Sequence, residues 1–232
     1  MKIVADENLA FTDYFFADLA EIEHKAGRRL THQDVQDADA LLVRSVTQVN
    51  AALIQQTALQ FIGSATIGTD HLDIPAIEQQ DITWSNAAGC NAQAVSEYVI
   101  TALLHLEPEL LHANQNFKLG IIGLGNVGSR LVKMAQLLGW DVIAYDPFVQ
   151  LPHVQQCDLD ALLQQADAIS IHVPLTETGE HPTHHLINAA RLACMKPQAI
   201  LINSARGPVV EEAALMQDIQ HTQRLVVLDV FE

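Results

Sequence analysis

Short apolar runs alternate with longer stretches of helical periodicity along the chain, and this alternation predicts the elements of the fold. In the first part of the chain the expected strands are the apolar runs 2–5, 40–44, 61–65 and 82–84. Helical periodicity between them predicts helices over 9–19, 51–56 and 74–80. Strands that alternate with helices favour a parallel sheet that has helices on both faces.

The same alternation returns after a long helical pattern over 92–106, which ends before Pro108. The expected strands of this second part are 118–122, 141–145, 168–172, 199–203 and 225–229. The expected helices are 126–138, 159–165, 188–193 and 211–219, and the polar segment 180–185 is expected to be a loop. We therefore predict an α/β protein with two doubly wound parallel-sheet domains, residues 1–92 and 93–232, with 92–106 as the helix that bridges them.

A glycine-rich turn joins the first strand and helix of the second domain. It reads Gly123-Leu-Gly125-Asn-Val-Gly128, and the next predicted strand ends at Asp146. Gly123 permits a tight turn, Gly125 lets the backbone approach a pyrophosphate, and Gly128 lets the helix pack close to its strand. The helix N-terminus offers free N–H groups and partial positive charge to the phosphates. This arrangement predicts a dinucleotide site.

The position of Asp146 selects between the two nicotinamide dinucleotides. A carboxylate at the tip of that strand accepts hydrogen bonds from both ribose hydroxyls and repels a 2′-phosphate. We therefore expect NAD rather than NADP as the cofactor.

Composition and charge exclude several classes of partner. The 232 residues are 49% hydrophobic and carry a net charge of −16, which argues against nucleic acid as a partner. The sequence has no apolar run long enough to span a membrane, and its first ten residues lack the pattern of a signal peptide. Its three cysteines are widely spaced and form neither a disulfide framework nor a zinc site. We expect a cytoplasmic protein with no membrane partner.

Arg206 is the candidate catalytic residue. It follows the predicted strand 199–203 and is flanked by Ser204-Ala205 and Gly207-Pro208. A planar, permanently charged guanidinium can hold a substrate carboxylate through two hydrogen bonds and polarise a forming carbonyl. The alternative is a structural arginine with a salt bridge in a loop. Its place at the carboxyl end of a strand favours the catalytic role.

Four motifs in this order resemble the D-isomer-specific 2-hydroxyacid dehydrogenases. They are GLGNVG with Asp146, IHVPLT (171–176), INSARGPVV (202–210) and LDVFE (228–232). The resemblance implies a flavodoxin-like substrate-binding domain over 1–92 and an incomplete Rossmann NAD-binding domain over 93–232. It also implies that hydride passes from a 2-hydroxy acid to NAD, with Arg206 as a catalytic residue.

The N-terminal half is similar to one branch of this family. The matching segments are DEN (6–8), VRSVTQVN (43–50), ATIGTDHLD (65–73) and AAGCNAQAVSEYV (87–99). That branch oxidises 4-phospho-D-erythronate to its 2-oxo acid in the biosynthesis of pyridoxal 5′-phosphate (vitamin B6). The resemblance therefore implies a small phosphorylated sugar acid as the substrate, and a homodimer for the full-length protein.

The resemblance also carries site residues onto this sequence. Ser45 and Thr66 match substrate-binding positions, and Arg44 either supplies charge nearby or forms a structural ion pair. The implied NAD contacts are the backbone N–H groups of Asn126 and Val127, the backbone of Val173, and residues Ser204, Ala205, Arg206 and Asp229.

Two further members of the family's catalytic set have no counterpart in this chain. The family's catalytic Glu and general acid–base His lie beyond the LDVFE segment. Either residues 1–232 are a fragment of a longer protein, or the chain is a shortened gene product, for which we expect weak turnover or none. Glu232 itself falls short of the catalytic position. His172 is interpreted as structural, and His181, His184 and His185 as solvated loop residues with only superficial metal-ligand spacing. We predict no metal site.

Two other functions stay open at this point. One is a non-catalytic NAD-sensing protein, because the fold does not determine the activity and the Glu and His are absent. The other is a dehydrogenase for a different 2-hydroxy acid, such as glycerate, lactate or phosphoglycerate.

Overall fold

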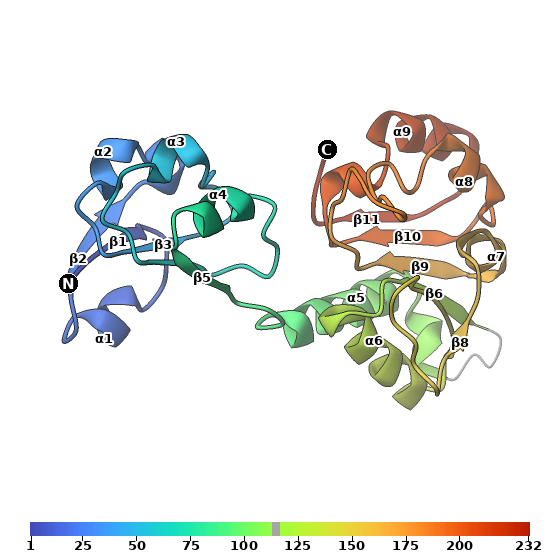
Figure 1. The fold of residues 1–232 in the computed structure, drawn as a ribbon. Coiled ribbons are helices and arrows are strands. Elements are labelled where there is room, and N and C mark those ends of the chain that lie inside the picture. The colour runs from blue at the N-terminus through green and yellow to red at the C-terminus, as the bar shows by residue number, and fades with distance from the viewer. Residues whose placement is uncertain (113–116) are drawn as a thin grey trace. The chain divides into compact units, whose positions relative to one another are not determined.

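A computed structural model describes residues 1–112 and 117–232 of the chain, and Figure 1 shows its elements. The chain divides into two compact units, Met1–Cys90 and Asn91–Glu232. Both units are α/β, each built on one parallel sheet. The functional roles predicted for the two parts of the chain stay predictions.

The sheet of the first unit has five parallel strands in the order β2-β1-β3-β4-β5. This is the flavodoxin-like order, as the family resemblance implied. The strands are β1 (Lys2–Asp6), β2 (Glu21–Lys25), β3 (Ala40–Val43), β4 (Phe61–Ser64) and β5 (Thr83–Asn86).

Helices cover the two faces of this sheet unequally. Three helices, α2 (His32–Val35), α3 (Ala51–Ile54) and α4 (Ile74–Gln79), lie on one face, and α1 (Thr12–Phe16) lies on the other (Figure 1). The larger core lies under the three helices, where Val35, Ile54 and Ile77 are fully buried. A 3₁₀ turn, Gly27–Arg29, precedes α2.

The N-terminal region differs from the prediction. The helix expected over 9–19 is only α1, five residues long, because Phe11 adopts a left-handed conformation at φ 62° and provides no side-chain cap. The chain then returns as β2, a strand that was not predicted, and α2 and the 3₁₀ turn were not predicted either.

The sheet of the second unit has six parallel strands in the order β11-β10-β9-β6-β7-β8. When β6 is numbered as strand 1 and the sheet is read from β8 to β11, the order is 3-2-1-4-5-6, which is typical of the Rossmann fold. The five predicted strands are β6 (Lys118–Ile122), β7 (Asp141–Tyr145), β9 (Ala168–Ile171), β10 (Ile200–Asn203) and β11 (Val226–Leu228).

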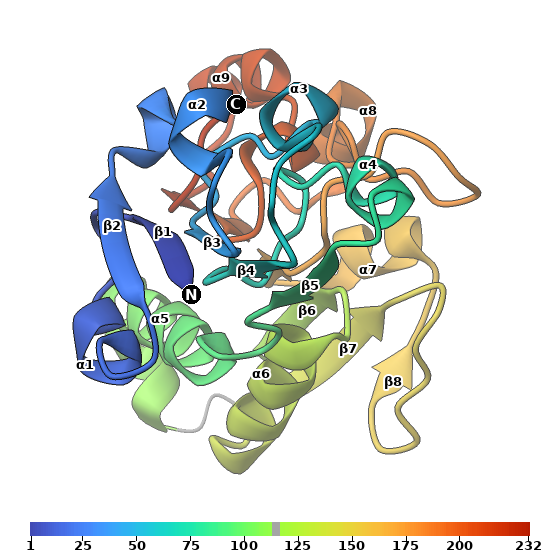
Figure 2. The same cartoon turned by 60° about the vertical axis from the view of Figure 1, so that its left-hand side comes forward.

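The sixth strand of this sheet is β8 (Gln155–Gln156), which lies beyond β7 at the sheet edge (Figure 2). It was not predicted. With β8, the sheet contains the six strands of this order.

Helices cover both faces of the second sheet (Figure 1). On one face lie α5 (Ala92–Leu106), which has the predicted bounds, and α6 (Asn126–Leu137). On the other lie α7 (Leu159–Gln165), α8 (Ala189–Cys194) and α9 (Glu212–His221). Alternate strand residues face the two layers, so Ile121 packs with α5 and α6 while Ile122 packs with α7. Short 3₁₀ turns span Pro108–His112 and Gly207–Val209.

Because all strands of a sheet are parallel, the loops after their carboxyl ends share one edge of that sheet. In the second unit this edge carries the glycine-rich turn, Asp146, Val173, the Ser204–Arg206 segment and Asp229. Within the described residues, no helix is both long enough and apolar enough to cross a membrane.

Candidate cofactor and substrate sites

The glycine-rich turn follows β6 and leads directly into α6, and its three glycines have different surroundings. Gly123 has φ +94°, and a Cβ atom there would lie 2.5 Å from the carbonyl oxygen of His172. A Cβ on Gly128 would lie 1.8 Å from the carbonyl oxygen of Gly123. A Cβ on Gly125 would meet no atom within 4 Å. Gly123 and Gly128 are therefore required by the turn itself, whereas Gly125 borders open space that suits a ligand.

Helix α6 begins beside this open space. Gly125 is its N-cap and provides no side-chain hydrogen bond to the first turn. The first N–H groups of a helix have no partner inside the helix, so those of Asn126 and Val127 are available to an anion. The twelve-residue helix adds the partial positive charge of its N-terminus.

Asp146 lies against the glycine-rich turn at the end of β7. Its Oδ2 accepts a hydrogen bond from the N–H of Leu124 at 2.7 Å. Its Oδ1 accepts from the N–H groups of Phe148 and Val149 at 2.8 and 2.9 Å. A carboxylate has about four acceptor sites, so capacity for a ribose hydroxyl remains. The turn and the acid that the sequence paired are thus adjacent.

Val173 also adjoins the turn, from the end of β9. The N–H of His172 donates to the carbonyl oxygen of Ile122 at 2.7 Å, which ties the two strand ends together. A Cβ on Gly123 would lie 3.0 Å from Cγ1 of Val173. The side chain of Val173 therefore packs beside Gly123, and the contact predicted for its backbone stays a prediction.

His172 is held in its neutral form. Desolvation by burial lowers the pKa of His172 to about 4, and its Nε2 lies 2.8 Å from Oγ of Ser170. A largely uncharged imidazole bonded to its own strand agrees with the structural role expected for it.

The depressed pKa of His172 makes the stability of the protein depend on pH. The unfolded chain takes up this proton near pH 6.5 and the folded chain only near pH 4. The contribution of neutral His172 to the free energy of unfolding is therefore complete above pH 6.5 and is lost as pH falls toward 4. Between about pH 7 and pH 5 we expect a loss of up to about 2 kcal/mol in the free energy of unfolding. Urea titrations of the wild type and His172→Gln measure it. The His172→Gln variant should lack this pH dependence of the free energy of unfolding, and His153→Gln, at an exposed position, should keep it.

The segment Ser204-Ala205-Arg206 forms a tight loop after β10, organised by Asn203. Oδ1 of Asn203 accepts from the N–H of Ala205 at 3.1 Å, and its Nδ2 donates to the carbonyl oxygen of Arg206 at 2.9 Å. Arg206 is half-buried, and its Nη1 donates to the carbonyl oxygen of Ala205 at 2.8 Å.

Two neighbours complete this corner of the second unit. Asp229, just after β11, is exposed, and its N–H donates to the carbonyl oxygen of Asn203 at 3.0 Å. Oγ of Ser204 is buried and has no hydrogen-bond partner among the residues that the structure describes. A buried hydroxyl is normally satisfied, so this one suits a polar group of a ligand or a water. The structure thus groups Arg206 with Ser204, Ala205 and Asp229.

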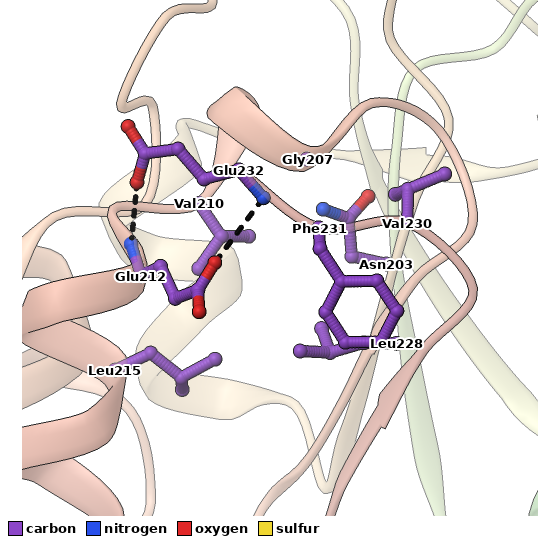
Figure 3. A pocket seen from close by; sticks show the side chains of 9 residues that line it. All are labelled: Asn203, Gly207, Val210, Glu212, Leu215, Leu228, Val230, Phe231 and Glu232. Atoms are coloured by element: carbon purple, nitrogen blue, oxygen red, sulfur yellow. Dashed lines mark hydrogen bonds between the residues drawn. The ribbon is translucent and has the colours of Figure 1, made fainter.

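The chain after β11 passes beside Gly207, the residue that follows this loop (Figure 3). A Cβ on Gly207 would lie 1.8 Å from the carbonyl oxygen of Phe231, so only glycine permits the approach. Oε2 of Glu232 accepts from the N–H of Glu212 at 3.0 Å, and the N–H of Glu232 donates to Oε2 of Glu212 at 3.2 Å.

The other carboxylate oxygen of Glu232, Oε1, lies 2.6 Å from Nε2 of His185. The hydrogen bond from His185, with that from the N–H of Glu212, lowers the pKa of Glu232 below its usual value. His185 is therefore not simply a solvated loop residue as the sequence suggested. Sequence reasoning missed this pair because its members are 47 positions apart.

In the first unit, Ser45 and Thr66 lie at one edge of the sheet, two residues after the paired strand ends Val43 and Ser64. Ser45 is exposed. Oγ1 of Thr66 donates to the carbonyl oxygen of Gly68 at 3.1 Å and lies 2.8 Å from Oγ of Ser64. The Thr66 hydroxyl has one hydrogen, so it must rotate away from Gly68 before it can donate to an oxygen of an anion.

Arg44 stands beside Ser45 and forms an ion pair with Asp6. Nε of Arg44 lies 3.0 Å from Oδ1 of Asp6, whose side chain is fully buried. Arg44 uses only Nε in this ion pair, and its two terminal guanidinium nitrogens make no hydrogen bond within the described residues. The ion pair that the sequence left open is present, and it still leaves two donor groups on Arg44.

Comparison with known proteins identifies relatives of the chain. The model of the D-isomer-specific 2-hydroxyacid dehydrogenase NAD-binding domain matches residues 104–232. Erythronate-4-phosphate dehydrogenase of Acinetobacter baumannii strain AYE is 70% identical over the whole chain, which spans 65% of that relative's length. The protein of the same name from Psychrobacter cryohalolentis is 42% identical, and the chain covers 68% of it. The second sheet thus contains its six strands in a chain that still spans only part of the length of its relatives.

Solved structures agree in fold. A D-lactate dehydrogenase from Aquifex aeolicus, complexed with NAD and lactic acid, matches with a TM-score of 0.84 and 26% sequence identity. The match covers the whole of this chain and 77% of the dehydrogenase chain. An NAD-bound 3-phosphoglycerate dehydrogenase from Entamoeba histolytica matches 99% of this chain and 80% of its own with a TM-score of 0.83 and 23% identity, which shows the fold alone. The cofactor predicted from the glycine-rich turn and Asp146, NAD, is the one that the matching domain family binds. The chain belongs to the D-isomer-specific 2-hydroxyacid dehydrogenase family.

Proposed function

We propose that the protein to which this chain belongs oxidises 4-phospho-D-erythronate at C2 and transfers the hydride to NAD. The observation that carries the proposal is the meeting, at one sheet edge of the second unit, of an open helix N-terminus, an acid for the ribose and the Arg206 loop. The 70% identity to proteins named erythronate-4-phosphate dehydrogenase supports the choice of substrate.

Each predicted residue has a role in this proposal. In the second unit, Gly123, Gly125 and Gly128 shape the turn, the N–H groups of Asn126 and Val127 bind the pyrophosphate, and Asp146 binds the ribose. Val173, Ser204, Ala205 and Asp229 contact NAD. Arg206 holds the substrate carboxylate and stabilises the charge that develops on the oxygen at C2.

In the first unit, Ser45 and Thr66 bind the phosphorylated acid, and the two terminal amino groups of Arg44 attract the anion. As C2 is oxidised, its hydride passes to NAD and its hydroxyl proton passes to a base. We assign no residue of 1–232 as that base. A place in pyridoxal phosphate biosynthesis, a cytoplasmic location and a homodimer stay predictions.

A substrate panel with the protein produced from its complete gene tests this function. NADH formation is measured with 4-phospho-D-erythronate, 3-phosphoglycerate, D-glycerate and D-lactate, each with NAD and with NADP. We expect the highest kcat/KM for 4-phospho-D-erythronate with NAD. Activity on phosphoglycerate with none on phosphoerythronate would refute the substrate, and NAD binding without turnover on any acid would support a sensor.

A further inference from the structure

Three side chains with metal-binding atoms meet in the second unit, away from the glycine-rich turn. They are His184 and His185, in the loop between β9 and α8, and Glu232, after β11. One imidazole nitrogen of each histidine and one carboxylate oxygen all lie within 4.8 Å of one another. The two imidazole rings stack with their centroids 4.0 Å apart. All three side chains are exposed or half-buried, so an ion from solvent can reach them.

The backbone explains why two consecutive histidines share one side of the loop. In extended chain, neighbouring side chains point in opposite directions. His185 instead has φ +49°, a left-handed conformation that is unfavourable for a residue with a Cβ. The N–H of His184 donates to the carbonyl oxygen of Thr176 at 3.0 Å, and that of His185 to the carbonyl oxygen of Pro208 at 2.7 Å. These bonds hold the loop in the conformation that brings the rings together.

Glu232 is oriented from the opposite side. Its Oε2 is bonded to the N–H of Glu212, and its own N–H is bonded to the Glu212 carboxylate, as Figure 3 shows. Its Oε1 is the atom that faces His185. The carboxylate is thus held by one oxygen and presents the other, which is how hydrogen-bonded neighbours commonly orient a metal ligand.

We propose that His184, His185 and Glu232 bind one divalent transition-metal ion of the Zn²⁺ class, with the fourth coordination position open to water. Two imidazoles and one carboxylate form a known tetrahedral donor set, in which bonds of about 2.1 Å place the ligand atoms about 3.4 Å apart. On binding, the distance between Nε2 of His185 and Oε1 of Glu232 would increase from 2.6 Å. The largest distance between two ligand atoms, which is at most 4.8 Å, would decrease. The net charge of −16 favours a cation.

The ion would tie the loop before α8 to the segment after β11. That segment carries Phe231, whose carbonyl oxygen packs on Gly207 beside Arg206. Metal binding would therefore fix the segment that packs on Gly207, the residue next to Arg206. This inference is independent of the dehydrogenase activity proposed above, and its test needs neither NAD nor substrate.

Calorimetric titration of the protein produced from its complete gene with zinc chloride alone, near neutral pH, tests the proposal. We expect one ion per chain, with affinity reduced more than tenfold in each of His184→Ala, His185→Asn and Glu232→Gln. Asparagine at 185 tolerates the left-handed backbone. The matched control is His181→Ala, which removes an exposed histidine of the same loop that lies outside the cluster and should bind zinc as the wild type does.

A second measurement on the wild type does not depend on how the variants fold. The imidazole NMR signals of His184 and His185 should shift or broaden during the zinc titration, while that of His153 should not. The proposal is overturned if the wild type shows no saturable binding, if those two signals stay unchanged, or if the three variants bind zinc as tightly as the wild type does.

Discussion

Replacing Gly128 with alanine is expected to destabilise the second unit by about 3 kcal/mol or more. The new Cβ would lie 1.8 Å from the carbonyl oxygen of Gly123. That carbonyl cannot move away freely, because Gly123 is itself held at φ +94° between β6 and the end of β9. Urea unfolding followed by the fluorescence of Trp140, which is buried in this unit, measures the change.

Gly125→Ala is the matched control, because it adds the same methyl group three residues earlier. Its Cβ would meet no atom of the chain, and its φ of −68° is open to alanine. We expect a loss of stability below about 1 kcal/mol, the usual cost of alanine at an N-cap. Its affinity for NAD should fall more than tenfold, since the methyl group occupies the space through which a pyrophosphate approaches. Equal stability of the two variants would contradict this account of the turn.

Strands made of apolar residues could be predicted from the sequence, including the edge strand β11, whereas the two polar edge strands β2 and β8 could not. Both faces of β6 and β7 are covered, so they are near-continuous apolar runs, and both have the predicted bounds. β2 and β8 each pair with one neighbour and are built from polar residues, Glu21–Lys25 and Gln155–Gln156. A strand that buries little leaves no hydrophobic pattern to read.

Exposed apolar residues produced the opposite error. The helix predicted over 9–19 depended on residues such as Phe11 and Phe15, whose exposed fractions are 72% and 64%. A pattern of apolar residues predicts a helix because a buried face stabilises it. Here that face is not buried, and only the short α1 forms.

Some contacts of the candidate site could be predicted from the sequence, and others could not. Topology alone brings the glycine-rich turn and Asp146 together, since both follow adjacent parallel strands. Pairs made by side chains far apart in sequence, such as Asp6 with Arg44 and His185 with Glu232, are fixed by packing and leave no local signal. The buried hydroxyl of Ser204 was predicted as a cofactor contact from resemblance, not from its surroundings.

Arg206→Gln is expected to lower kcat/KM for the 2-hydroxy acid by about a hundredfold to a thousandfold, in the protein produced from its complete gene. Glutamine removes the positive charge that stabilises the oxygen at C2 and the paired N–H groups that hold the carboxylate. Arg206→Lys keeps the charge but not the paired geometry, so its loss should be smaller and yet clear. Initial rates of NADH formation measure both variants.

Three controls separate a catalytic Arg206 from a structural one. Arg130→Gln makes the same change of charge at an exposed position on α6 and should leave the rate unchanged. NAD affinity in Arg206→Gln should fall less than tenfold, because Asp146 and the start of α6 do not depend on this side chain. The free energy of unfolding should fall by only about 1 kcal/mol, the usual contribution of a hydrogen bond such as the one from Nη1 to Ala205, since the two bonds of Asn203 to the backbone of this loop are kept. A variant that loses stability in proportion to its activity would show that Arg206 serves the fold and not the reaction.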